Sequence, residues 1–274
     1  CRPACLELPA LTGGQRMRVV YAPTDRHVER THWRTYAVLG HTFAGSCRVV
    51  ARALAGRLSA ADVDHRVQRW CDHVFRLSKT TVRVWGDQHI DRTQAHVLLS
   101  NHVSLLDIPA VCVTYPGRVR FVAKEELRKV PAFGEAMAAA GIVFVDRANR
   151  QRAIEQLQQT AELFAEGTSV WIAAEGSRSR DGRLHPFKKG GFHVALHHGL
   201  PIVPVWIHGT LDVIPPDQFG SVTGQCVDVF YGEPVPTQGR TTADLAELVA
   251  VTRQRMLALA RRAGAPADVD AVSP

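Results

Sequence analysis

Short apolar runs of strand length alternate with helical stretches from residue 81 to residue 262. The strand-like runs lie at residues 81–85, 96–99, 119–123, 142–145, 169–173, 202–207 and 227–231. The helical stretches that separate or follow them lie at residues 108–113, 125–140, 150–166, 191–198 and 242–262. Such alternation predicts an α/β layered fold, in which helices flank a mixed, largely parallel sheet.

Two further helical stretches, at residues 35–58 and 61–78, precede this alternation and predict an N-terminal amphipathic helical segment. The first has apolar positions that include Val38, Leu39, Phe43 and Val50, and basic positions in or beside it at Arg34, Arg48, Arg52 and Arg57. A basic amphipathic helix suits the interface of an anionic membrane. An ordinary helix packed on the protein's own core has the same pattern, so both readings stay open.

The chain divides into four parts on these patterns. Residues 1–34 contain several prolines and glycines without periodicity, so we expect a poorly ordered lead. Residues 35–78 form the helical, membrane-contacting or core-packed segment, residues 79–262 form the main domain, and residues 263–274 form a frayed tail. At 274 residues and 46% hydrophobic, the chain is long enough for a well-buried core.

Composition narrows the class of partner. The formal net charge of +7 suits a nucleic acid, a phosphorylated substrate or an anionic membrane surface. The six cysteines form no Cys-x-x-Cys pair, so we expect neither a zinc site nor a redox motif, and a reduced cytosolic protein. No stretch of about 20 residues lacks charge, which predicts that no helix spans a membrane.

A histidine and an aspartate stand five residues apart directly after the run at 96–99: His102 and Asp107. Five residues turn an ideal helix by about 500°, so the two side chains meet only if a turn separates them. Ser100-Asn101 breaks the strand, and Asp107 opens a helix with an early proline. A loop histidine above a helix-start aspartate is therefore the predicted geometry.

Such a pair suits general-base chemistry. Imidazole accepts a proton near neutral pH, and a carboxylate on its other nitrogen fixes the tautomer and stabilises the imidazolium. The chain has no Gly-x-Ser-x-Gly nucleophile elbow, so the base would act on a substrate hydroxyl directly. The alternative is that His102 only caps a loop and Asp107 only caps a helix.

Charged and flexible residues follow the other strand-like runs as well. These positions are Lys124-Glu125, Asp146-Arg147 and Glu175-Gly176-Ser177-Arg178-Ser179-Arg180. The carboxyl ends of parallel strands meet at one edge of a sheet, where such folds bind ligands. Arginine forks match phosphate oxygens, and a glycine permits close backbone approach. The sequence therefore predicts an anion site beside the base.

Four ordered motifs carry a resemblance to a known family. They are Asn101-His102-x4-Asp107, Gly141-Ile-Val-Phe-Val-Asp-Arg147, Glu175-Gly-Ser-Arg-Ser179 and Leu200-Pro-Ile-Val-Pro-Val205. Together they resemble the glycerophospholipid acyltransferase family, with the 1-acylglycerol-3-phosphate (lysophosphatidate) acyltransferases as the most similar member type. The resemblance covers about residues 80–235, and it departs from the usual pattern at Ser177, where threonine is more common.

The resemblance implies a mechanism and a set of site residues. His102 would be the general base on the acceptor hydroxyl, oriented by Asp107. That hydroxyl would attack the thioester of acyl-CoA or acyl-carrier protein without an acyl-enzyme, and no metal or cofactor would be needed. The substrate-binding positions would be Lys124, Arg147, Glu175, Gly176, Ser177 and Arg178. The main domain would then be the catalytic domain.

Alternatives remain at the level of the substrate and of the class. The acceptor could be another lysolipid, such as a lyso-ornithine lipid, or glycerol-3-phosphate. A non-catalytic phosphate-lipid binding protein and a thioester hydrolase are more distant readings. Under the main reading, the partners are a lysolipid, an acyl thioester, an acyl-carrier protein and an anionic membrane, with no nucleic acid. We then expect a peripheral protein on the cytoplasmic face of the membrane.

Overall fold

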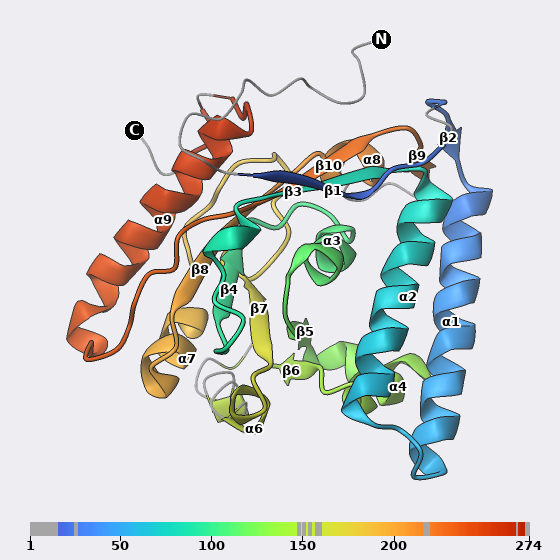
Figure 1. Cartoon of the computed structure of the whole chain (residues 1–274), viewed down its shortest axis with the longest axis horizontal. Coiled ribbons are helices and arrows are strands. Elements are labelled where there is room, and N and C mark those ends of the chain that lie inside the picture. The colour runs from blue at the N-terminus through green and yellow to red at the C-terminus, as the bar shows by residue number, and fades with distance from the viewer. Residues whose placement is uncertain are drawn as a thin grey trace.

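A mixed sheet with helices on both faces organises the chain (Figure 1). The computed structural model describes residues 16–24, 27–146, 149, 152, 155–156, 161–215, 220–266 and 268–271. In this part of the chain the main sheet has the order β1-β3-β10-β8-β4-β7-β5-β6, and β2 pairs with β9 separately. The predicted fold class is confirmed.

The elements have the following bounds. The strands are β1 (Met17–Tyr21), β2 (Arg30–Thr31), β3 (Thr81–Trp85), β4 (Val97–Ser100), β5 (Val119–Lys124), β6 (Val143–Val145), β7 (Ser169–Ala173), β8 (Ile202–His208), β9 (Ser221–Val222) and β10 (Cys226–Tyr231). The α-helices are α1 (Trp33–Leu54), α2 (Ala60–Ser78), α3 (Asp107–Thr114), α4 (Phe133–Ala139), α6 (Ala161–Ala165), α7 (Gly190–His198), α8 (Thr210–Val213) and α9 (Leu245–Arg262). Short 3₁₀ turns lie at Asp87–His89, Glu125–Lys129 and Thr242–Asp244. Every predicted strand is present, with ends that shift by at most one residue.

A block of parallel strands positions the carboxyl-end loops. β8, β4, β7, β5 and β6 are neighbours in this order, and each adjacent pair is parallel. β10 runs antiparallel to β8, and β1 runs antiparallel to β3. The loops that follow β4, β7, β5 and β6 therefore leave the sheet at the same edge.

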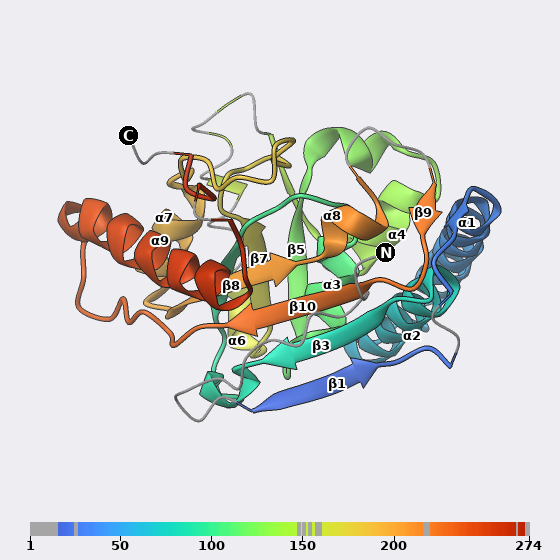
Figure 2. The ribbon, with the colours of Figure 1, turned by 90° about the horizontal axis from the view of Figure 1, so that it is seen from above.

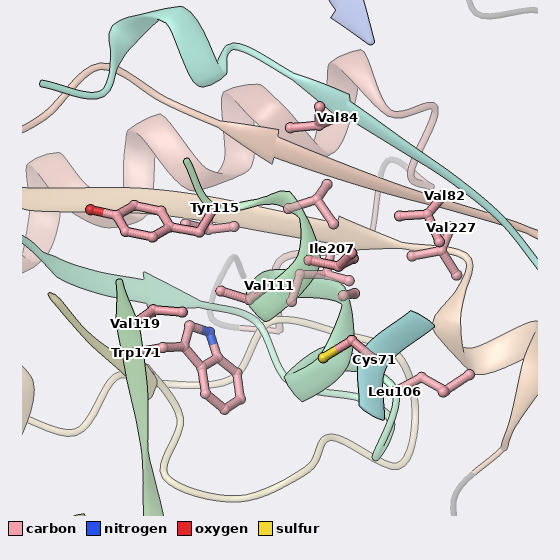
Figure 3. Close-up of a cluster of buried hydrophobic side chains, with 14 of the residues drawn as sticks. Cys71, Val82, Val84, Leu106, Val111, Tyr115, Val119, Trp171, Ile207 and Val227 are labelled. Atoms are coloured by element: carbon pink, nitrogen blue, oxygen red, sulfur yellow. The ribbon is translucent and has the colours of Figure 1, made fainter. Parts of the chain in front are cut away.

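The core lies on both faces of this sheet because neighbouring strand residues point to opposite sides. Leu98 packs with α2 and α3, in a cluster that includes Cys71, Val111 and Trp171 (Figure 3). Val97 and Leu99 face the other side, where the buried side chains of α7 and α9 cover the sheet. Figure 2 shows these two helical layers on either side of the strands.

The predicted N-terminal helical segment folds as a hairpin of α1 and α2. Ser59 and Asp62 form a capping box that starts α2. α2 faces the core, whereas α1 is the outer helix and packs against α2 and α4. Trp70 Nε1 donates a hydrogen bond of 2.9 Å to Thr42 Oγ1 and joins the two helices. None of the described helices is long and apolar enough to cross a membrane.

The expected poorly ordered lead is wrong for residues 17–21 and 30–31. Met17–Tyr21 forms β1, the edge strand beside β3, and Arg18 Nη2 lies 2.9 Å from Asp87 Oδ2. Met17 and Val19 are about half exposed in this strand. The missing signal has a physical reason, because an exposed edge strand needs no continuous buried apolar run. Residues 1–15 and 25–26 lie outside the described residues.

The expected frayed tail is also wrong over most of its described length. Leu184 N donates to Val269 O at 2.7 Å, and Ala271 N donates to Leu184 O at 3.2 Å. Arg253 on α9 pairs with Asp270. These long-range contacts hold the tail against the loop after β7, and composition alone does not encode them.

Two predicted helices differ from expectation. The stretch 125–140 is a 3₁₀ turn followed by α4, because Pro131 lacks an N–H and Ala132 adopts φ +59°. Gly134 belongs to this break, since a Cβ there would lie 2.1 Å from Arg128 O. Much of the stretch 150–166 lies outside the described residues, which show α6 at its end.

The cysteines are not all reduced. Cys47, Cys71 and Cys112 carry free thiols, but Cys226 is disulfide-bonded, so the expectation of reduced cysteines is wrong at this position. The spacing of cysteines does not reveal such pairing.

Candidate active site

The structure brings His102 and Asp107 into contact. His102 lies two residues after β4, Asp107 is the first residue of α3, and His102 Nδ1 is 2.7 Å from Asp107 Oδ2. The predicted turn separates the two, so a loop residue faces a helix start. Because a carboxylate only accepts hydrogen bonds, Nδ1 carries the proton and Nε2 is left as the basic nitrogen.

Asp107 is fully buried and saturated with donors. Its Oδ2 also accepts from Val103 N at 2.7 Å and from Ser104 N at 2.9 Å. Its Oδ1 accepts from Thr210 Oγ1 at 2.6 Å. Burial of a carboxylate is costly unless it is hydrogen-bonded, and these donors compensate for the lost water. The charge of Asp107 is thereby held against the imidazole.

The imidazole of His102 is packed yet reachable. The side chain of His102 is 12% exposed to solvent, whereas that of Asp107 is fully buried. The ring of Trp171 on β7 meets it edge to face, with ring centroids 5.5 Å apart. Trp171 is fixed in turn by a 2.9 Å hydrogen bond from Nε1 to Ser100 Oγ. The ring of His102 is therefore held in one orientation while part of its side chain stays accessible.

Asn101 joins the start of the His102 loop to β8. Its Nδ2 donates to Ile207 O at 2.9 Å, and its Oδ1 accepts from Ile207 N at 2.8 Å. The side chain is 3% exposed, so these bonds are shielded from water. A single amide thus continues the hydrogen bonding of two parallel strands beyond their ends.

Glu175 lies at the end of β7, next to the base. Its Oε1 accepts from His102 N at 3.4 Å, and its Oε2 accepts from His185 N at 3.0 Å. Burial raises the pKa of Glu175, and the two N–H donors partly oppose that shift. His102 O accepts a further bond of 2.7 Å from Ser179 N. In this structure Glu175 binds the backbone of two loops around the base.

The other predicted binding positions lie on the same edge. Gly176 adopts φ +78°, and a Cβ there would be 3.0 Å from Lys188 Cγ, so only glycine fits this turn without strain. Ser177 and Arg178 are exposed just before the segment that bonds His102. Lys124 is exposed at the end of β5, the neighbour of β7. Arg147 lies outside the described residues, two positions after the end of β6.

Two exposed cations, Lys124 and Arg178, lie at this edge of the sheet, which is called the basic edge below. Neither Lys124 nor Arg178 forms an ion pair with a described carboxylate, so both are free to meet an anion. Neighbouring strands are about 4.8 Å apart, which places the β5 end about 10 Å from the β4 end. Within the described ranges, no three His, Cys, Asp or Glu side chains gather as a metal site.

Two functional positions escaped sequence reasoning. Thr210 and Trp171 both contact the pair, but neither belongs to a local pattern that includes His102. Thr210 is 103 residues from Asp107 along the chain, so no spacing rule connects them. The only available signal was the place of Thr210, three positions after the end of the predicted strand 202–207.

Comparisons with known proteins agree with this geometry. A family model described as Acyltransferase matches residues 81–208. Human 1-acyl-sn-glycerol-3-phosphate acyltransferase alpha is 35% identical over 190 residues, which cover 69% of this chain and 67% of the human protein. The 1-acyl-sn-glycerol-3-phosphate acyltransferase of Saccharomyces cerevisiae is 32% identical over 207 residues, covering 74% and 68%.

A solved structure matches as well. The crystal structure of the 1-acyl-sn-glycerophosphate (LPA) acyltransferase from Thermotoga maritima superposes with a TM-score of 0.69 at 26% identity. The match covers 83% of this chain and 94% of that one. The fold and the site thus define an α/β acyltransferase. The chain belongs to the acyltransferase family that includes the human and yeast 1-acyl-sn-glycerol-3-phosphate acyltransferases, which confirms the resemblance of the four motifs.

Proposed function

We propose that the protein transfers a fatty acyl group from a thioester to the free hydroxyl of 1-acylglycerol-3-phosphate, giving phosphatidate. The observation that carries this proposal is the 2.7 Å contact between His102 and Asp107 beside a basic sheet edge. The names of the human, yeast and Thermotoga relatives support the choice of acceptor. The donor is acyl-CoA or an acyl-carrier protein, whose thioester has the same reacting bond.

The pair acts on the acceptor hydroxyl directly. His102 Nε2 takes the hydroxyl proton while the oxygen attacks the thioester carbonyl carbon, and Asp107 stabilises the imidazolium. The tetrahedral intermediate then breaks its C–S bond, and the departing sulfur takes the proton from the imidazolium. An ester and a free thiol result, and His102 is neutral again. No acyl-enzyme is needed because the acceptor itself is the nucleophile.

The basic edge holds the phosphate of the acceptor. Lys124 and Arg178 supply charge-assisted donors, and Arg147, which lies outside the described residues, comes two positions after β6 in the sequence. Gly176 and Ser177 give the backbone close access, while Glu175 fixes the loops that frame the site.

An acceptor panel tests this function. One labelled acyl-CoA is offered with 1-acylglycerol-3-phosphate, glycerol-3-phosphate, lysophosphatidylcholine and a lyso-ornithine lipid, and products are resolved by mass. We expect phosphatidate as the main product. If another acceptor is preferred, the proposed acceptor is wrong but the proposed acyl transfer stands. Thiol release without any acceptor means hydrolysis, and no release at all means a binding protein.

We also propose that α1 contacts an anionic membrane on the cytoplasmic face. Its exposed apolar side chains follow helical spacing along one stripe: Trp33, Tyr36, Leu39, Phe43 and Leu54. Only Leu39 and Phe43 of the predicted apolar face belong to this stripe, because Val38 packs against the core and Val50 is half-buried. Of the predicted basic residues, Arg34 bonds Leu77 O and Arg52 pairs with Asp62. Arg48 and Arg57 are exposed on the same segment, and each basic residue near an anionic surface contributes about 1 kcal/mol.

Liposome flotation tests the membrane contact. The variant Leu39→Asp with Phe43→Asp places two charges in the stripe, and we expect it to lose most binding to anionic vesicles. Val28→Asp is the matched control, since Val28 is 51% exposed but lies outside α1. Equal flotation of the stripe variant and the control would show that α1 does not carry the contact.

A further inference from the structure

The hydroxyl of Thr210 completes the set of donors on Asp107. Thr210 is fully buried as the first residue of α8, and it lies outside all four motifs. Its Oγ1 is 2.6 Å from Asp107 Oδ1. Because a carboxylate only accepts, the threonine hydroxyl donates this hydrogen bond.

The Thr210 bond is one of three side-chain links between residues 207–214, from the end of β8 to the residue after α8, and residues 101–107. The Asn101 amide binds Ile207 through two hydrogen bonds. Ser104 Oγ donates to Ile214 O at 2.8 Å. The residues from β8 through α8 therefore hold both ends of the turn that presents the base.

The chain reaches Asp107 only because of the glycine before Thr210. Gly209 adopts φ +85°, and a Cβ there would lie 2.0 Å from Cys226 O. A side chain at residue 209 would therefore clash with the backbone of β10. The backbone conformation of Gly209 thus directs the side chain of Thr210 toward Asp107.

The two carboxylate oxygens of Asp107 accept hydrogen bonds from different parts of the chain. Oδ2 receives His102 Nδ1 and the N–H groups of Val103 and Ser104, all from the same turn. Oδ1 receives Thr210, which starts α8 after the carboxyl end of β8. A donor on the second oxygen fixes the plane of the carboxylate, because it opposes rotation about the Cβ–Cγ bond. Oδ2 is thereby kept in line with the imidazole.

We propose that Thr210 is a positioning residue for the acyl transfer, which acts through Asp107 to hold His102 in its productive orientation. This inference rests on the proposed function, in which His102 is the general base. In this inference, the turn after β8 fixes the orientation of Asp107 and His102, although it is not part of the loop that contains them.

Substitution of the hydroxyl alone tests this role. Thr210→Val keeps the shape of the side chain, and we expect kcat to fall about tenfold with little change in the acceptor KM, since the bond aligns the base and does not bind substrate. Thr210→Ser keeps the donor and should restore most of kcat. Thr252→Val is the matched control, because Thr252 is fully buried on α9 and its hydroxyl has no hydrogen-bond partner in the part of the chain that the structure describes.

A double-mutant cycle separates this inference from the proposed function. In a His102→Ala background, Thr210→Val should cause no further loss, because the base that it positions is absent. An equal tenfold loss in both backgrounds, or wild-type kcat for Thr210→Val, overturns the positioning role while the general-base role stands. If Thr210→Val does not fold, Thr210→Ala against Thr210→Ser gives the same comparison. Near-wild-type turnover of His102→Ala overturns the proposed function and this inference together.

Discussion

β4 has a histidine at each end, and the two have opposite environments. His96 directly precedes the strand, is fully buried, and contacts Tyr115 Oη at 3.0 Å through Nδ1. His102 follows the strand, keeps some exposure, and contacts the carboxylate of Asp107 at 2.7 Å. Burial lowers the pKa of His96, so this imidazole is held neutral. We therefore assign packing to His96, and the proposed function assigns the chemistry to His102.

The difference follows from the direction of the parallel strands. At the amino end, His96, Tyr115 and Ser169 form a closed hydrogen-bonded network, in which burial raises the pKa of Tyr115 to about 12. At the carboxyl end, the turn between β4 and α3 directs the backbone N–H groups of Val103 and Ser104 to Asp107. The position relative to the sheet is thus what differs between the two histidines, and we expect it to decide which one exchanges a proton with a substrate.

The largest expected effect is the loss of the carboxylate. Asp107→Asn removes the charge that stabilises the imidazolium, and we expect acyl transfer to fall by about 10²–10⁴. Tyr115→Phe removes the polar partner of the other histidine and should leave turnover within about twofold. The check is kcat for both variants with the same acceptor. Similar losses in the two variants would mean that the two ends of β4 do not differ as described.

A smaller effect is expected on stability from the amide at the start of the loop. Asn101→Ala leaves Ile207 N and O without their bonds, and a buried unpaired group costs about 1–3 kcal/mol. Gln94→Ala, at the exposed amino side of β4, should change the free energy of unfolding by less than about 0.5 kcal/mol. Urea denaturation of both variants measures the difference. If the two variants have equal free energies of unfolding, Asn101 does not join the two strands as described.

Arg178 tests the basic edge with a moderate effect. Arg178→Ala should raise the acceptor KM about tenfold and leave the donor KM nearly unchanged, because a charge-assisted contact to phosphate contributes about 1.5–3 kcal/mol. Arg262→Ala removes an exposed arginine at the end of α9 and is the control. A raised donor KM with an unchanged acceptor KM would assign the arginine to the phosphates of the donor instead.

The smallest effect concerns pH and the buried histidine. Because the pKa of His96 is lower in the folded than in the unfolded protein, its stability contribution is present above about pH 6.5 and falls as the pH decreases. Glu175 has the opposite sign, since its raised pKa favours folding only as the pH decreases toward its unfolded value. His96→Gln should therefore lose less stability than wild type between pH 7.5 and 5.5. The free energy of unfolding is measured by urea denaturation at several pH values. An equal change with pH in the variant and the wild type would contradict this prediction.

Much of the fold was predictable because its signals are local. Buried parallel strands read as short apolar runs, and the turn between His102 and Asp107 follows from spacing and breakers. β1 was missed because an exposed edge strand lacks such a run, and the docked tail was missed because its bonds come from Leu184 and Arg253. The local sequence pattern predicts the elements and the His102–Asp107 pair. The residues that support this pair are determined by tertiary contacts, which the local pattern does not contain.

The site shows the same division. His102 and Asp107 are five residues apart and were found, whereas the link from Thr210 crosses 103 residues. Glu175 was predicted as a binding residue from the resemblance of its motif. The structure adds that both of its oxygens accept backbone N–H groups, a feature that no motif encodes.

The most direct test of the account compares the two histidines of β4. Acyl transfer to 1-acylglycerol-3-phosphate is measured for His102→Ala and His96→Gln, with folding verified by circular dichroism. The account predicts that His102→Ala loses about 10²–10⁴ in kcat, the usual size of a general-base contribution, and that His96→Gln stays within about twofold of wild type. Near-wild-type turnover of His102→Ala would contradict the assignment of the base and leave the His102–Asp107 contact a structural one.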